Sequence, residues 1–152
     1  MEMALPFDFF GTLKVPGVRL EAIAGQIEIA IISQGGRITH LSEQLVEFRG
    51  VVNYLSLSPL TNIAHGEIEF RAYPSGVNLA YTVHVDRAPF VAAVLCILAG
   101  LGCWAVGLTE FAFFAIFGLM ILSVAIVASV VIRRRFPRWL RKICNTSSSS
   151  MN

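Results

Sequence analysis

One apolar run, from Ala88 to Ile132, constrains this chain more than any other feature, and Glu110 is its only charged residue. A single helix of that length would rise about 68 Å at 1.5 Å per residue. The hydrocarbon core of a bilayer is about 30 Å thick and takes about 20 residues per crossing. The run therefore predicts two membrane-spanning helices, at about 89–107 and 111–133, with a tight turn near Gly107 and Glu110.

The first predicted span has a recognisable start and a pattern of small side chains. Asp86 can accept hydrogen bonds from free backbone N–H groups, and Pro89 falls in the first turn, where it is tolerated. Small residues spaced by four let a second helix approach closely, which predicts packing of the two spans on one another. The expected helix-packing residues are Ala92, Cys96, Ala99, Gly100, Cys103 and Gly107. The alternative is that small residues are simply common in membrane helices.

The stretch VVIRRRFPRWLRK, residues 130–142, places six cations directly after the apolar run. Pro137 disfavours a helical residue before it and can begin a new helix, so the second span is expected to end near Arg135. A short amphipathic helix at 136–144 would then lie along anionic lipid headgroups, before a disordered tail at 145–152. The predicted membrane-interface residues are Arg133, Arg134, Arg135, Phe136, Arg138, Trp139, Arg141 and Lys142.

The distribution of cations predicts an orientation in the membrane. The turn between the spans has no Lys or Arg, whereas the C-terminal flank has six. Cytoplasmic loops carry the excess of Lys and Arg, so a two-pass protein with both termini in the cytoplasm is expected. A nucleic-acid role would need this cluster free of the bilayer, and no nucleic-acid partner is expected. Cys144, beside the interface, could accept a palmitate or stay an unmodified thiol.

Residues 1–87 are expected to form a small β domain. Glu67–Tyr73 and Val77–Asp86 alternate apolar and polar side chains around a Pro74-Ser75-Gly76 turn, which predicts a β-hairpin. Further strands are expected at Gln26–Ser33, Ile38–Leu41, Leu45–Arg49 and Val51–Leu57, with a loop at 57–66. A helix over Leu41–Phe48 stays open, since short apolar runs are ambiguous.

This pattern suggests one antiparallel sheet with a single buried face, and such a sheet needs a cover. The segment LPFDFF near the N-terminus, the membrane surface of the hairpin and a partner chain are the three candidates. The concave side of the sheet, which would include Phe70, Leu79, Tyr81 and Val83, is an alternative site for an apolar ligand.

Motifs for chemistry are absent from the sequence. His40, His65 and His84 have no carboxylate at a ligand spacing, so a metal site would form only if the fold gathers them. No nucleophile, phosphate-loop or metalloprotease pattern appears. No catalytic residue, metal or cofactor is therefore predicted, and the chain is not expected to be an enzyme.

Together these features predict an α+β membrane protein. A β domain at 1–87 would be followed by a transmembrane hairpin at 88–135 and a basic interfacial helix at 136–144. The expected role is that of a non-catalytic accessory, assembly or scaffolding subunit, with a membrane-protein partner or a second copy of itself. The alternative role is a membrane-bound module for a lipid or another apolar ligand.

Overall fold

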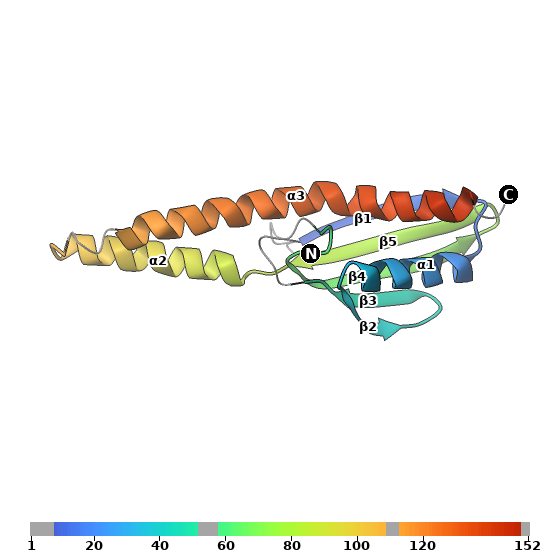
Figure 1. The fold of residues 1–152 in the computed structure, drawn as a ribbon, viewed down its shortest axis with the longest axis horizontal. Coiled ribbons are helices and arrows are strands. Elements are labelled where there is room, and N and C mark those ends of the chain that lie inside the picture. Colours follow the sequence, from blue (N-terminus) through green and yellow to red (C-terminus); the bar gives the residue numbers. More distant parts are fainter. Residues whose placement is uncertain (1–7, 52–57, 109–112, 150–152) are drawn as a thin grey trace, which may run out of the picture. The chain divides into compact units, whose positions relative to one another are not determined.

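The computed structural model describes residues 8–51, 58–108 and 113–149, and an antiparallel sheet is followed by two long apolar helices (Figure 1). Two compact units are present. The sheet unit consists of Met1–Val85 and Ile132–Asn152, and the hairpin unit is Asp86–Val131. The elements are β1 (Asp8–Pro16), α1 (Leu20–Ser33), β2 (Arg37–Leu41), β3 (Leu45–Arg49), β4 (Ile63–Tyr73), β5 (Gly76–Val85), α2 (Ala88–Ala105) and α3 (Phe113–Ser149).

The sheet has the strand order β1-β5-β4-β3-β2, and every neighbouring pair is antiparallel. The predicted hairpin is confirmed: Tyr73 pairs with Gly76, and the register continues along β4 and β5. The strands expected at Ile38–Leu41 and Leu45–Arg49 are also present, so the helical alternative for Leu41–Phe48 is excluded.

The prediction of a strand at Gln26–Ser33 is wrong, because these residues belong to helix α1. Ile23, Ile27 and Ile31 repeat every four residues and are all fully buried. That spacing places them one above the other on a single helix face. The alternation of Ile27, Ile29 and Ile31 imitates a strand, but Ile29 is in fact exposed.

The buried face of the sheet is covered by two helices. Alternate side chains of the strands form its core, and they cluster with the three buried isoleucines of α1. The same cluster includes the end of α3, through Ile132, Phe136, Leu140 and Cys144. In Figure 1, α1 and the C-terminal part of α3 run alongside the strands. The cover thus comes from this chain itself. Part of it, the end of α3, follows the hairpin unit in the sequence.

Helix α3 corrects the expected break near Arg135. It continues through Pro137 and ends at Ser149, so residues 136–144 are not a separate helix and the described part of the tail is helical. A proline inside a helix costs about 3 kcal/mol. Full burial of one large apolar side chain contributes about 1.5–3 kcal/mol. Phe136 and Leu140 are both fully buried on the sheet, and their burial offsets the cost of the proline.

Two smaller predictions, a strand and a loop, concern the residues in and after 52–57, a range outside the described residues. Most of the strand expected at Val51–Leu57 lies outside the described residues, and Val51 forms only an isolated bridge with Thr61. The predicted loop at 57–66 is too long, since β4 begins at Ile63. The turn before this strand includes Asn62, whose φ is 60°.

The hairpin unit contains α2 and the first part of α3, two helices that are long and apolar enough to cross a membrane. The start of α2 agrees with its predicted signals: the Ala88 N–H donates to Asp86 Oδ1 at 3.0 Å, and Pro89 lies in the first turn. At its end, Gly107 has a φ of 82°, and the Leu108 N–H donates to the Cys103 carbonyl at 2.9 Å. This is the glycine-dependent ending common in α-helices.

Candidate functional site

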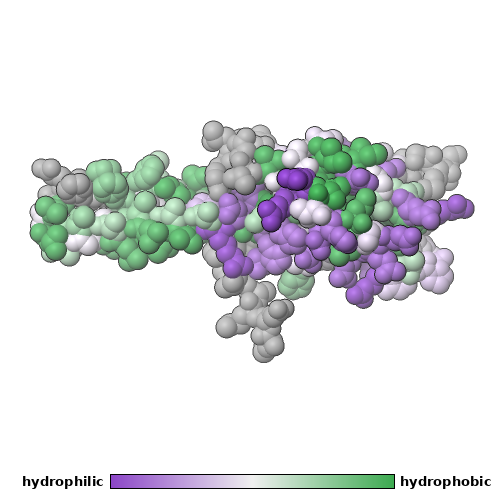
Figure 2. Space-filling view, turned by 90° about the horizontal axis from the view of Figure 1, so that it is seen from below, coloured by the Kyte–Doolittle hydropathy of each residue, from purple (hydrophilic) through white to green (hydrophobic). Residues whose placement is uncertain are grey.

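The surface of the hairpin unit is the most unusual feature of the chain. All but five of the large hydrophobic side chains exposed in the described residues belong to this unit; the five are Phe10, Ile29, Ile32, Leu41 and Tyr73. Figure 2 shows that the visible surface of α2 and the first part of α3 is almost continuously hydrophobic, whereas that of the sheet unit is mainly hydrophilic. Monomeric soluble proteins rarely expose apolar patches larger than a few hundred Å². This surface is suited to an apolar environment.

Within the hairpin unit, the two helices approach closely at two glycines, Gly100 and Gly118. A Cβ added to Gly100 would collide with the backbone nitrogen of Ala115, and one added to Gly118 would lie 2.8 Å from the Ala93 carbonyl oxygen. Of the predicted helix-packing residues, Gly100 lies at this contact, and Cys96 and Cys103 are half-buried. Ala92, Ala99 and Gly107 are exposed. Ala93, which the predicted set lacks, is fully buried.

The cationic segment of α3, residues 133–142, belongs to the sheet unit and has one cationic side and one apolar side. Arg133, Arg134, Arg135, Arg138, Arg141 and Lys142 are exposed. Phe136 is 0% exposed, and Trp139 is half-buried with its ring 5.6 Å from that of Phe136. The apolar side that was expected to enter the headgroup region therefore faces the sheet, while the cations face outward.

Phe136 is the centre of an aromatic cluster that joins α3 to the sheet. Its ring centroid lies 6.0 Å from Phe9, 6.1 Å from Phe48 and 5.4 Å from Tyr81. Burial raises the pKa of the Tyr81 phenol, and the nearby positive charge of Arg141 opposes this shift. Tyr81 thus belongs to the core and stays neutral at neutral pH.

Cys144, the candidate for palmitoylation, is only 1% exposed and belongs to the same core. Burial raises the pKa of its thiol to about 11, which keeps it protonated at neutral pH. The thiolate is the reactive form of cysteine. Acylation would require α3 to leave the sheet, so the structure favours the unmodified thiol.

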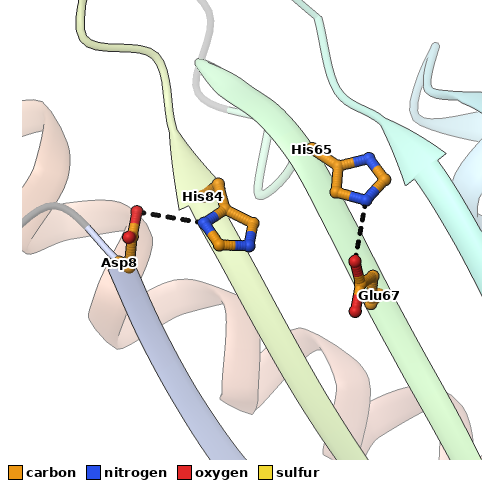
Figure 3. Close-up of polar contacts among 4 residues, drawn as sticks. All are labelled: Asp8, His65, Glu67 and His84. Atoms are coloured by element: carbon orange, nitrogen blue, oxygen red, sulfur yellow. Dashed lines mark hydrogen bonds and ion pairs between the residues drawn. The ribbon is translucent and has the colours of Figure 1, made fainter. Parts of the chain in front are cut away.

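The face of the sheet opposite the core brings two of the three histidines together (Figure 3). His65 and His84 are opposite one another on β4 and β5, with ring centroids 6.0 Å apart and nearly parallel. His65 Nε2 lies 3.0 Å from a Glu67 oxygen, and His84 Nδ1 lies 3.2 Å from an Asp8 oxygen. The register of the hairpin, counted from its turn, would have predicted this pairing.

His40 lies on β2 opposite Glu47, which in turn lies opposite Glu67, so it is separated from the histidine pair. Among the described residues, no group of three or more His, Cys, Asp or Glu is arranged to hold a metal ion. The two histidine–carboxylate pairs lie on an open strand surface. They are outside the groove of about 1030 Å³ that is lined by α1 and by the β2–β3 and β4–β5 turns.

The proposed lining of an apolar ligand site is filled by the protein. Phe70, Leu79, Tyr81 and Val83 all belong to the buried core under α1 and α3. The sheet therefore has no free apolar side for a ligand at these residues, and this choice of binding residues is corrected.

No protein-family model, curated protein or solved structure matches this chain. The function must consequently be inferred from its surfaces, of which the apolar surface of the hairpin unit is the most distinctive.

Proposed function

We propose that this chain is a two-pass integral membrane protein that anchors a cytoplasmic β domain. Its role is that of a non-catalytic accessory or assembly subunit of a membrane complex. The observation that carries the proposal is the exposed apolar surface of the hairpin unit, since such a surface is stable in lipid and unfavourable in water.

The composition of the sheet unit supports two crossings. Its core combines strands that precede the hairpin with Phe136, Leu140 and Cys144, which follow it. Segments on either side of the hairpin can share a core only if both lie on the same side of the membrane. An even number of crossings meets this requirement, and the cations after Val131 favour the cytoplasmic side.

Cysteine labelling tests the topology. In a background with alanine at Cys96, Cys103 and Cys144, single cysteines are introduced by Leu108→Cys in the turn and by Arg71→Cys in the sheet unit; both positions are exposed. A membrane-impermeant maleimide added to intact cells should label only the turn variant. After the cells are permeabilised, the maleimide should also label the Arg71→Cys variant. The reverse pattern would contradict the orientation, and recovery of the chain in the soluble fraction would contradict membrane insertion.

The subunit role is tested by purification in mild detergent after crosslinking in native membranes. We expect another membrane protein in stoichiometric amount. A preparation that contains only copies of this chain, with membrane insertion already shown, would refute the accessory role while leaving the anchored β domain intact.

A further inference from the structure

The sheet unit has a groove of about 1030 Å³, which we call the α1 groove. It is lined by one side of α1, by the segment directly before this helix, and by the turns that join β2 to β3 and β4 to β5. Pockets for small molecules usually measure about 300–1,000 Å³. The α1 groove therefore has room for a larger ligand, such as a short stretch of polypeptide.

Much of the lining of the α1 groove is apolar. Val18 and Val77, which belong to the core, line it together with the half-buried Leu20. Leu41 and Tyr73, at the ends of β2 and β4, also line it and are 47% and 55% exposed. Two of the five large hydrophobic side chains exposed outside the hairpin unit thus lie at one groove. A ligand with apolar side chains would remove this surface from water, which favours binding.

The charges of the α1 groove are mainly negative. Glu21 and Glu28 lie about two helical turns apart on α1, and Glu43 lies in the β2–β3 turn. None of the three forms an ion pair with another residue that the structure describes. Arg19 is the one cation among the described residues of the lining. The apolar surface is therefore bordered by carboxylates whose charge is available to a cationic ligand.

We infer that the α1 groove binds a segment of a partner protein in which large apolar side chains are flanked by Lys or Arg. Charge complementarity favours this occupant, because its cations would meet Glu21, Glu28 and Glu43 while its apolar side chains cover Leu41 and Tyr73. Lipid headgroups fit poorly, since their phosphate groups would face the three glutamates. The inference rests on the proposed subunit role, because it states the chemistry by which this chain recognises another subunit.

A peptide titration tests the α1 groove directly. The full chain in phosphatidylcholine nanodiscs is titrated against a fluorescent peptide in which pairs of leucines alternate with pairs of lysines, and empty nanodiscs correct for binding to lipid. We expect saturable binding that weakens as salt is added, because salt screens the charge pairs. A peptide with glutamate in place of lysine should not bind. Equal binding of the two peptides, or no binding of either, overturns the inference.

Matched variants assign the binding to the α1 groove. Glu28→Lys is compared with Glu47→Lys, because Glu47 is also half-buried but lies between the core residues Val46 and Phe48 and so points to the opposite face of the sheet. Glu28→Lys should weaken binding of the lysine peptide by about tenfold, since it replaces an attraction with a repulsion. Glu47→Lys should retain it. Tyr73→Ser, at an exposed position, should also weaken binding. Equal affinities of all three variants, with circular dichroism showing each to be folded, argue against the α1 groove.

Photocrosslinking in native membranes tests the natural occupant. Tyr73 is replaced by p-benzoylphenylalanine, with the same replacement of Glu47 as the control. Residue 73 should crosslink to another protein through a segment that carries Lys or Arg beside apolar side chains. A crosslink to lipid, to an acidic segment or to a second copy of this chain overturns the inference. Membrane fractionation of the same samples separates the two proposals: a membrane-inserted chain without a crosslink at residue 73 refutes the inference alone, whereas a soluble chain contradicts the anchoring.

Discussion

The Phe136→Ala substitution separates the two environments that can be assigned to the basic end of α3. The side chain is fully buried, and its ring lies within about 6 Å of the ring centroids of Phe9, Phe48, Tyr81 and Trp139. If Phe136 is a core residue of the sheet unit, its truncation leaves a cavity between α3 and the sheet. If it lies among headgroups, its truncation weakens lipid contact and leaves the sheet unaffected.

The expected magnitude follows from burial. Truncation of a buried phenylalanine to alanine costs about 3–5 kcal/mol, including the cavity that it leaves. A domain of ordinary stability has only about 5–15 kcal/mol in total. The substitution should therefore remove a large part of the stability of the sheet unit. Arg138→Ala, at an exposed position on the same helix, should change it by no more than about 0.5 kcal/mol.

Guanidinium unfolding in detergent, followed through the fluorescence of Trp139, measures this loss. The other tryptophan, Trp104, belongs to the hairpin unit and is replaced by phenylalanine in every variant. We expect Phe136→Ala to unfold at a lower guanidinium concentration than the unsubstituted protein, and Arg138→Ala to unfold at the same concentration. Equal midpoints for the two variants, with weaker binding of Phe136→Ala to anionic vesicles, would refute the core position and restore the interfacial interpretation.

Three further predictions address other parts of the chain. Gly100→Leu should force α2 and α3 apart, at a cost of about 1–3 kcal/mol, and lower the thermal midpoint in detergent; Gly102→Leu, with nothing within 4 Å of the added Cβ, should not. The raised pKa of Cys144 predicts that the sheet unit loses stability at high pH. Between the usual pKa of 9.0 and the folded-state pKa of about 11, the thiol ionises only in the unfolded chain, which favours unfolding. The slope should be about 1.4 kcal/mol per pH unit, and Cys144→Ala should remove it between about pH 9 and 10 in denaturant titrations; above about pH 10 the raised pKa of Tyr81 contributes a loss of its own. Gly25→Ala, at an open helical position, should raise the unfolding free energy of the sheet unit by about 0.5–1 kcal/mol, which guanidinium titration measures; a decrease would contradict the free space there.

The apolar helices and the β4–β5 hairpin could be predicted from the sequence because each has a strong local signal. The length and composition of 88–132 indicated two helices, and the alternation around Pro74 and Ser75 indicated two strands. Helix α1 could not be assigned, because Ile27, Ile29 and Ile31 satisfy a period of two while Ile23, Ile27 and Ile31 satisfy a period near four. Only tertiary packing decides between the two, since either arrangement places a row of isoleucines on the core.

The end of α3 shows the other limit of sequence analysis. An apolar stripe at Ile132, Phe136 and Leu140, opposite arginines, fits a lipid interface and fits the surface of a sheet equally well. Pro137 added a local signal for a helix break, which long-range burial overrode. The sequence did indicate that the sheet lacked a cover, but nothing local identified a segment more than 45 residues downstream of β5 as that cover.

The position of this cover has a consequence for how the sheet unit reaches its folded state. The strands are synthesised first, and the core stays incomplete until α3 supplies Phe136, Leu140 and Cys144. Until then Phe9, Phe48 and Tyr81 lack the aromatic partner that joins them. In a protein with two crossings, that partner reaches the sheet only after the second crossing has returned the chain to the starting side. If the hairpin unit crosses the membrane twice, as we propose, a chain in which the second crossing fails would lack Phe136, Leu140 and Cys144 in the core of the sheet unit.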